Sequence, residues 1–278
     1  MPSPKQQKVC FISARSAHLP GNNLVIMDWA NGRLIRHLAD NWSNSFSLAV
    51  FSNPVRNQNY QLDLKVPRLY SLPFPLSFSG GLINTFKLIR ILKRIEREND
   101  ILIVQLPFVG FLSLFFIKKP IVFHLCANVL TASANPLKYK GLKSIISGSF
   151  AKFMHACFKN FFGRKNSGLI VNGEELGAIY ALYNPKVVVS SSIFKDEIVN
   201  PGTITKRAQE CPFELLFIGR PSKEKGFPVL IEAFRQLLEK GLNVKLSMIG
   251  ILKEELSRLS DFNLDNQYLG KVTFYGFL

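Results

Sequence analysis

The chain alternates short apolar runs with longer amphipathic segments. The runs are almost continuous in apolar residues, as is typical of strands buried on both faces. In the first part of the chain they cover residues 9–12, 46–51, 101–104, 121–125, 169–171 and 187–190. Between the second and third runs, Leu88, Leu92 and Ile95 recur on one helical face of residues 82–98, with basic residues on the other. This alternation of strands and helices predicts an α/β fold with a parallel sheet.

The pattern stops at residue 190 and restarts at residue 213. Residues 191–212 include Pro201 and Gly202 and several hydroxyl residues, which predicts a linker between domains. Beyond it we expect strands at 214–218, 244–249 and 272–275, and helices at 227–240 and 253–259. We therefore expect two Rossmann-like domains, 1–190 and 213–278. The second is expected to be incomplete, because a doubly wound domain usually has about 100–150 residues.

Two segments bear on membranes and export. The apolar segment 101–117 contains Gln105 and Pro107, which favours a buried strand followed by a short helix over a membrane span. The apolar run near the N-terminus covers only residues 9–12, so no signal peptide is predicted. The four cysteines (Cys10, Cys126, Cys157 and Cys211) have no C-x-x-C spacing. This argues against a zinc site or a disulfide framework and suits a reducing cytoplasm.

Charge is concentrated in the first domain. The formal net charge is +16, and residues 1–200 hold 24 basic and 10 acidic residues, a net of +14. No acidic residue lies between Asp100 and Glu174. This imbalance predicts an anionic partner for the first domain, a membrane surface or a polyanion.

Residues 138–165 combine basic and aromatic side chains. Phenylalanines alternate there with lysines and arginines, which is typical of an amphipathic helix lying in a membrane interface. We expect this tract to bind anionic lipid. The alternative is a core helix whose polar face is basic. Nucleic acid is disfavoured as a partner, because no RNA- or DNA-binding signature accompanies the tract.

The segment 214–226, ELLFIGRPSKEKG, holds the clearest chemistry. A strand ends at Gly219, a basic loop follows, and a helix begins after Gly226. Loops at the carboxyl ends of parallel strands bind ligands in open α/β sheets. Arg220 and Lys225 are placed to bind one anionic group, helped by the helix dipole. The alternative is a solvated basic turn. The loop is not a Walker A motif, since no Gly-Lys-Ser/Thr closes it.

The stretch FIGRPSKEKG followed by FPVLIEAFRQLL resembles the donor-binding motif of retaining glycosyltransferases of the GT-B fold, family 4 type. The resemblance extends through 244–250 and 271–278, and is weaker over residues 1–200. It implies that Arg220 and Lys225 hold the diphosphate of a nucleotide sugar, with Gly219 and Gly250 shaping the donor site. It also implies transfer with retained anomeric configuration, with no cofactor and no bound metal.

The same resemblance suggests sites in the first domain. His124, at the end of the run 121–125, matches a histidine that helps bind donor or acceptor, and it is our catalytic candidate. The alternative is a buried histidine without a ligand. Gly21, flanked by His18, Asn22 and Asn23, stands where the family has a glycine-rich loop that contacts a phosphate.

Three departures from the family pattern limit what the resemblance implies. An acidic-Gly-Pro loop is replaced by Ile251-Leu252-Lys253, a Pro-Asn-Gly by Ser191-Ser192-Ile193, and the glutamate pair that binds the donor sugar would lie beyond Leu278. We expect a hexosyltransferase that acts on a lipid-linked glycan in cell-surface polysaccharide synthesis, peripheral on the cytoplasmic face of the cell membrane. The alternative is a truncated, inactive product that only binds membrane or a partner.

Overall fold

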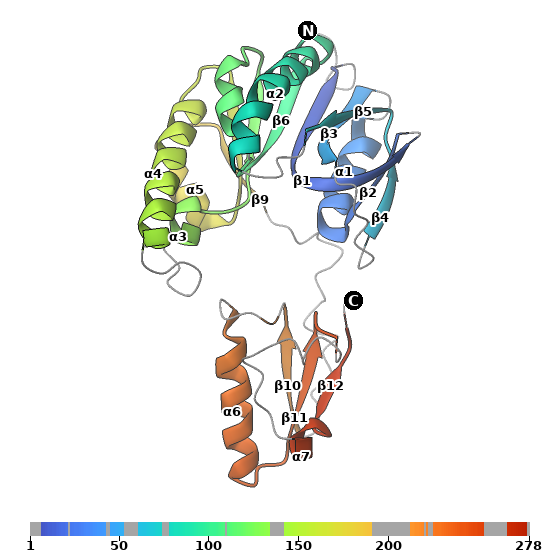
Figure 1. Ribbon diagram of the computed structural model, residues 1–278, viewed down its shortest axis with the longest axis vertical. Helices are drawn as coiled ribbons and strands as arrows, with labels where there is room; N and C mark the ends of the chain where they lie inside the picture. The colour runs from blue at the N-terminus through green and yellow to red at the C-terminus, as the bar shows by residue number, and fades with distance from the viewer. Residues whose placement is uncertain are drawn as a thin grey trace. The chain divides into compact units, whose positions relative to one another are not determined.

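The computed structural model describes residues 7–21, 23–42, 45–52, 61–73, 78–108, 110–133, 142–190, 212–219, 221, 225–252 and 266–276 (Figure 1). These residues fall into two compact units. Unit 1 ends with strand β9 (Val187–Ser190), and unit 2 begins with strand β10 (Phe213–Ile218).

Unit 1 is built on a parallel sheet in the order β5-β3-β1-β6-β7-β8-β9. Its further strands are β1 (Val9–Gly21), β3 (Phe46–Ser52), β5 (Arg68–Leu72), β6 (Ile101–Leu106), β7 (Ile121–Leu125) and β8 (Ser167–Asn172). The predicted α/β class is confirmed, and six of these seven strands overlap the predicted runs. The strand that was not predicted is β5, because Arg68 and Ser71 interrupt its apolar pattern.

Strand β1 is much longer than its predicted apolar run. Its first part pairs with β3 and β6, whereas His18 to Gly21 pair antiparallel with β2 (Leu24–Asp28), which in turn pairs with β4 (Gln61–Lys65). Gly21 and Asn23 take positive φ angles, 114° and 57°, as a tight turn between antiparallel strands requires. The segment expected to form a glycine-rich ligand loop therefore belongs to a β-hairpin.

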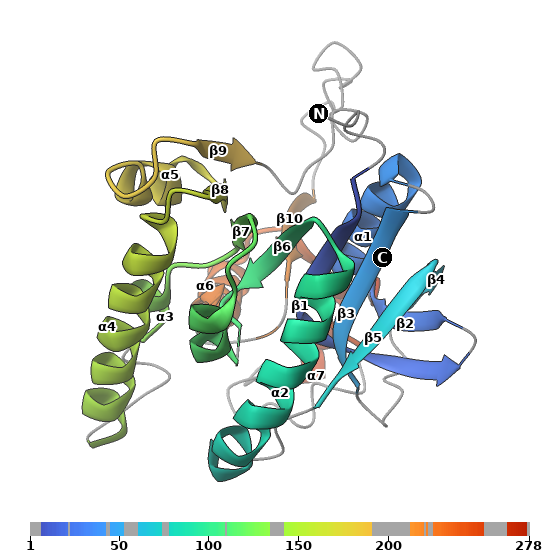
Figure 2. The same cartoon turned by 90° about the horizontal axis from the view of Figure 1, so that it is seen from above.

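Helices cover both faces of the parallel sheet. Along β1, Val9 and Phe11 pack into one apolar cluster and Cys10 and Ile12 into another, so successive residues are buried on opposite faces. The helix α1 (Trp29–Trp42) belongs to the first face, and α2 (Phe78–Glu98), the 3-10 helix η3 (Phe111–Phe116) and α4 (Leu142–Phe162) belong to the second (Figure 2). This two-sided burial explains why the central strands read as continuous apolar runs.

The order of the strands creates a topological switch point. From β1 the chain passes through β2 and α1 to β3 on one side, and from β5 it passes through α2 to β6 on the other side of β1. The connections of β1 and β6 thus diverge. Ligands of open α/β sheets bind at the carboxyl ends of the strands at such a point.

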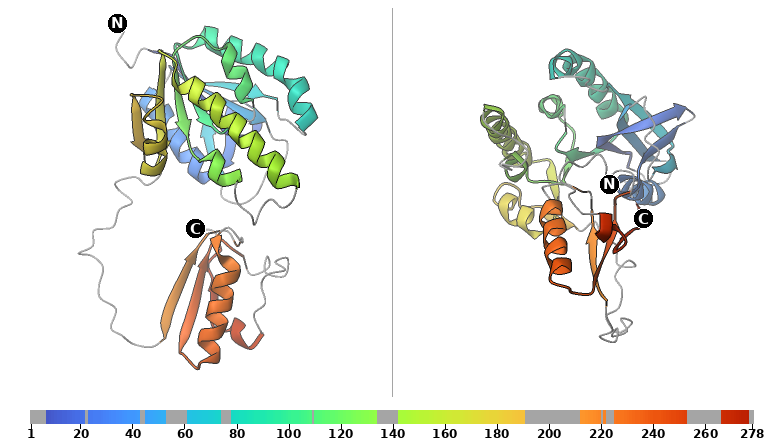
Figure 3. Two further views of the ribbon diagram at one scale, coloured as in Figure 1. Left: turned by 90° about the vertical axis from the view of Figure 1, so that its left-hand side faces the viewer. Right: turned by 60° about the horizontal axis from the view of Figure 1, so that its bottom comes forward.

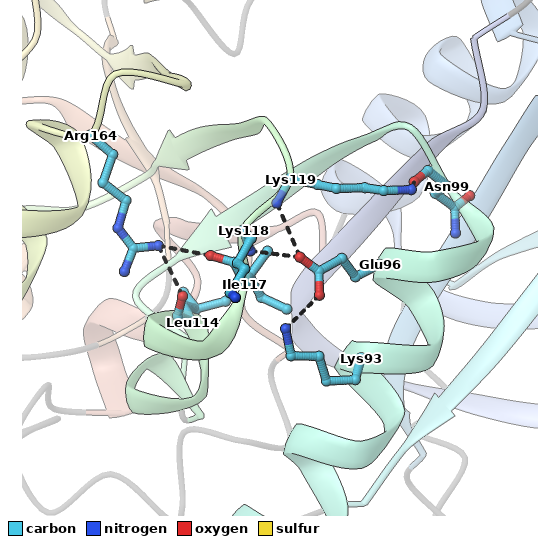
Figure 4. A network of polar contacts seen from close by, with 8 residues as sticks. All are labelled: Lys93, Glu96, Asn99, Leu114, Ile117, Lys118, Lys119 and Arg164. Carbon is cyan, nitrogen blue, oxygen red and sulfur yellow. Dashed lines mark hydrogen bonds and ion pairs between the residues drawn. The ribbon is translucent and has the colours of Figure 1, made fainter.

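A polar network secures η3 between α2 and α4 (Figure 4). Glu96 of α2 accepts hydrogen bonds from the backbone N–H groups of Lys118 (2.6 Å) and Lys119 (3.0 Å) and from Nζ of Lys93 (2.7 Å). Arg164, which follows α4, donates to the carbonyl oxygens of Leu114 (3.0 Å) and Ile117 (3.4 Å). Glu96 and Arg164 thus provide hydrogen-bond partners for backbone N–H and C=O groups in and after η3. A helix this short leaves most of these groups without a partner inside the helix.

Unit 2 has a three-stranded parallel sheet in the order β10-β11-β12. Its remaining elements are β11 (Val244–Ile249), β12 (Val272–Phe274), α6 (Phe227–Glu239) and the short α7 (Asn266–Leu269). Phe227, Ile231 and Phe234 of α6 pack against β11 in a separate core. Strands and α6 were predicted to within one residue at each end. The predicted helix 253–259 lies outside the described residues.

Candidate functional site

A row of polar side chains crosses unit 1 near the carboxyl ends of its strands. Ser13 of β1, Gln105 of β6 and His124 of β7 are buried in it. Oγ of Ser13 donates to Oε1 of Gln105 (3.2 Å), and Nε2 of Gln105 donates to Oδ1 of Asn31 (3.0 Å). Nε2 of His124 lies 3.1 Å from Oδ1 of Asn172, at the end of β8. The row therefore spans the switch point and the two strands beyond it.

A β-bulge in β1 makes room for this row. Ile12 pairs with Ala49 of β3, but the next partner of β3, Phe51, lies opposite Ser16, so the bulged strand has extra residues. The backbone pairing of β1 with β6 ends at Ile12. Beyond it, the backbone N–H of Ala14 donates to the side-chain oxygen of Gln105 (3.1 Å) instead of to a backbone carbonyl of β6. The bulge thus parts two strands where the topology predicts a ligand site.

His124 makes its side-chain contact with the end of β8 through Asn172. Oδ1 of Asn172 accepts from Oγ of Ser190 (3.0 Å) and faces Nε2 of His124. An amide oxygen only accepts, so Nε2 carries the hydrogen and Nδ1 keeps a lone pair. Burial lowers the pKa of His124, and the hydrogen bond to Asn172 only partly opposes this. A neutral imidazole with a lone pair on Nδ1 is suited to accept a hydrogen bond from a sugar hydroxyl or to take up a proton.

Cys126 lies beside His124 but is not an activated nucleophile. Its Sγ is 3.8 Å from Nδ1 and 3.7 Å from Nε2, so the sulfur is not directed at one nitrogen lone pair. Burial raises the pKa of the thiol, with the Gln105 hydrogen bond acting weakly in the opposite direction. A thiolate is the reactive form, so this pair does not resemble a cysteine–histidine catalytic couple.

Gly21 lies apart from the polar row along β1. It ends the strand in the β-hairpin turn, where its backbone is exposed and a Cβ would meet nothing within 4 Å. His18, in the same arm, pairs with Ile26 of β2. The structure therefore gives the hairpin arm no direct link with His124 among the described residues.

In unit 2 the predicted glycines meet at the carboxyl ends of β10 and β11. Gly219 and Gly250 have φ angles of 146° and 94°, and the Gly219 N–H donates to the carbonyl of Ile249 (2.9 Å). A Cβ on Gly250 would stand 2.8 Å from the Gly219 carbonyl oxygen. The two turns are thus in close backbone contact, which only glycine permits at Gly250.

The basic loop leads from this glycine pair to the N-terminus of α6. Gly226 takes a left-handed conformation (φ 70°) just before the helix, and a proline occupies the helix's first turn. Lys225 is exposed and has no ion pair with any residue that the structure describes. Arg220 lies outside the described residues. Lys225, the free N–H groups of α6 and the glycine turns can together receive a phosphate group.

The sequence analysis proposed His124 and the glycine loop as candidate site residues but did not propose Ser13, Gln105 or Asn172. Each of these three follows or interrupts an apolar run. A polar residue at the end of a strand buried on both faces is the signal that could have pointed to them.

The comparison with solved structures gives low similarity over most of the chain. MurG from Acinetobacter baumannii is 12% identical with a TM-score of 0.43, covering 98% of this chain and 68% of that one. A UDP-forming α,α-trehalose-phosphate synthase from Burkholderia xenovorans is 11% identical with a TM-score of 0.48, covering 98% and 74%. The spinosyn forosaminyltransferase SpnP is 11% identical with a TM-score of 0.43, covering 97% and 70%.

Sequence similarity to a known family is confined to the second part of the chain. No curated protein matches the chain. The part that contains the glycine turns, the basic loop and α6, residues 205–278, matches the model of the family glycosyl transferases group 1.

Proposed function

We propose that the protein transfers a sugar from a nucleotide-sugar donor to a glycan acceptor. The observation that carries this proposal is the family match over residues 205–278, together with the glycine turns and Lys225 that this segment contains. Unit 2 binds the donor. The diphosphate lies over Gly219 and Gly250 and is held by Lys225 and Arg220, whose positive charge offsets the charge that develops on the departing diphosphate.

Unit 1 binds the acceptor at the polar row. Neutral His124 offers Nδ1 to an acceptor hydroxyl, and Gln105 and Asn172 fix the surrounding hydrogen bonds. The transfer retains the anomeric configuration and uses no resident metal, as the resemblance to family 4 implies. The donor is a hexose nucleotide, and the acceptor is a lipid-linked glycan of a cell-surface polysaccharide.

We place this reaction on the cytoplasmic face of the cell membrane, with the protein bound peripherally. Among the residues described, no helix combines the length and apolar character that a membrane span needs. The basic segment between Asp100 and Glu174 supports a contact with anionic lipid.

The donor site is tested by calorimetry with UDP and GDP. Lys225→Ala removes one charged hydrogen bond of about 1.5–3 kcal/mol, so diphosphate affinity should fall about tenfold or more. Arg220→Ala should act in the same way. The control is Lys240→Ala, at the opposite end of α6, which should leave affinity unchanged. Equal affinity in all three variants would exclude the loop as the donor site.

Turnover separates the proposal from its alternative. Release of the nucleoside diphosphate in the presence of donor and acceptor extract supports the transferase. Binding of UDP or GDP without any turnover would instead favour an inactive protein that retains the donor site.

A further inference from the structure

Unit 1 carries a continuous exposed apolar surface on α4 and η3, which we call the apolar face. It consists of Ile145, Ile146, Phe150 and Phe153 of α4 and Leu112, Phe115 and Phe116 of η3. Ile145 and Ile146 are 67% and 61% exposed. Scattered exposed apolar residues are normal in a soluble protein, but a contiguous group of this kind marks an interaction site.

Ring contacts show that the two elements form one face. The buried ring of Phe111 in η3 lies 6.2 Å from that of Phe150 and 6.1 Å from that of Phe153. At the other end of η3, Phe115 lies 4.5 Å from Phe161 of α4. The exposed residues of η3 therefore lie beside the exposed apolar residues of α4. Helix α4 itself runs along one side of unit 1 (Figure 3, left).

Most of the exposed apolar residues of α4 lie in its N-terminal half. Because α4 connects the parallel strands β7 and β8, its N-terminal half lies toward the carboxyl ends of the strands. Three of the four exposed apolar residues of α4, Ile145, Ile146 and Phe150, are in that half. This end of the apolar face therefore lies toward the edge of the sheet where His124 and Asn172 lie, whereas Phe115, which contacts Phe161, extends the face toward the other end of α4.

The segment that forms the apolar face carries charges of one sign. The segment from Asp100 to Glu174, which includes η3 and α4, contains no acidic residue between these two ends. Lys118, Lys152 and Lys165 are exposed on it. An apolar surface with only basic charges in its own segment suits a surface of anionic lipid, whose headgroups attract lysine while its acyl boundary accepts aromatic and aliphatic side chains.

The structure corrects the residues that sequence assigned to this contact. Phe158, Phe161 and Phe162 are buried in the core rather than exposed. Nζ of Lys159 lies 4.6 Å from the centre of the Tyr183 ring, and Arg164 hydrogen-bonds the backbone of η3. Lys138 and Lys140 lie outside the described residues.

We propose that the apolar face docks on a bilayer containing anionic lipid and so holds the polar row beside a lipid-linked acceptor. This deepens the acceptor part of the proposed function and rests on it, although the docking itself requires no sugar transfer. A second copy of the chain is a poorer occupant, because a two-fold contact would bring the same lysines against each other.

The test is sedimentation of the full chain with vesicles of phosphatidylcholine alone or mixed with phosphatidylglycerol. The wild type should bind the mixed vesicles and hardly bind the neutral ones. Ile145→Ser with Ile146→Ser should weaken binding about tenfold or more, because both side chains enter the interface. The matched control is Leu182→Ser with Val229→Ser, which removes two even more exposed apolar side chains elsewhere and should change nothing.

A second pair of variants separates charge from insertion. Lys118→Gln, Lys152→Gln and Lys165→Gln should weaken binding about tenfold or more at low salt. Lys240→Gln, Lys245→Gln and Lys271→Gln lower the net charge equally but alter unit 2, and should have little effect. The isoleucine variant should retain the salt dependence of the wild type.

Several results would overturn the proposal. They are equal binding to neutral and mixed vesicles, full binding by the isoleucine variant, equal losses in both lysine variants, or a dimer that the isoleucine variant dissociates. Calorimetry with UDP and GDP on the same samples reports the donor site independently. If the wild type bound UDP or GDP but did not bind the mixed vesicles, the docking would be rejected and the transferase proposal would stand.

Discussion

Gly250 and Gly241 share a left-handed backbone but differ in their surroundings. The φ angle is 94° at Gly250 and 76° at Gly241. A Cβ at Gly241 would meet nothing within 4 Å, whereas one at Gly250 would stand 2.8 Å from the carbonyl oxygen of Gly219. Comparing an alanine substitution at Gly250 with one at Gly241 therefore separates the effect of the close contact between the two turns from the effect of the left-handed backbone.

Gly241→Ala should lower the free energy of unfolding of unit 2 by about 1–2 kcal/mol, the cost of a left-handed alanine. Gly250→Ala should cost more, and should also weaken UDP and GDP binding, because the turns must move apart. Urea unfolding followed by circular dichroism, with calorimetry, measures both effects. Equal losses of stability in the two variants would show that the turns separate freely.

His124 gives unit 1 a pH dependence with a defined sign. Burial lowers its pKa in the folded protein, so the unfolded chain binds the proton more tightly. Stability should therefore fall as the pH decreases through the ordinary histidine range, and the loss is complete below the folded pKa. His155, whose pKa is also lowered by burial, contributes in the same direction.

His124→Gln should reduce the loss of unfolding free energy between about pH 7 and about pH 5. Urea unfolding at the two pH values measures it, with His37→Gln on the exposed side of α1 as the control. A pH dependence identical to the wild type would mean that folding does not lower the pKa of His124.

At the scale of elements, Glu96 joins α2 to the connection between η3 and β7. Burial alone would raise the pKa of this carboxyl, but the hydrogen bonds from Lys93 and from the backbone N–H groups of Lys118 and Lys119 lower it overall. The carboxylate thus stabilises the fold above the ordinary pKa of glutamate, and this contribution is lost as the pH falls.

Glu96→Ala leaves two backbone N–H groups without their acceptor and should lower the free energy of unfolding by about 1–3 kcal/mol. Glu96→Gln keeps an acceptor oxygen and should cost less. Exposed Glu175→Ala serves as the control, and thermal unfolding with urea titration gives the values. If the alanine variant were as stable as the control, the network would not hold η3.

At the scale of the molecule, the two units have separate cores. Both tryptophans, Trp29 and Trp42, belong to α1 of unit 1, so tryptophan fluorescence follows unit 1 alone. Circular dichroism follows both units. The two signals therefore report whether the units unfold independently.

Phe234→Ala, in the fully buried core of unit 2, should destabilise that unit by about 3–5 kcal/mol. The transition seen by circular dichroism should shift to lower urea, while the fluorescence midpoint stays in place. Leu92→Ala, in the core of unit 1, should move the fluorescence midpoint. A shift of both signals by Phe234→Ala would show that the units unfold together.

The sequence by itself determined the elements that are buried on both faces or strongly amphipathic. Strands β7 and β11 and helix α6 are found at or within one residue of their predicted bounds, because local apolar pattern and turn residues are enough to define them. The glycine turns and Lys225 were also identified locally, since their chemistry lies within one strand–loop–helix segment.

Only the tertiary structure decided the features that depend on distant residues. The hairpin arm of β1 and strands β4 and β5 need partners that a short window of sequence does not reveal. Ser13 and Gln105 are 92 residues apart in the chain and meet only because β1 and β6 are neighbours in the sheet. Arg164 belongs to the tract that was expected to bind anionic lipid, yet it donates to the backbone carbonyls of Leu114 and Ile117, 50 and 47 residues away. Charge and hydropathy can be read from each residue by itself. Burial and hydrogen-bond partners arise only when the sheet brings separate segments of the chain together.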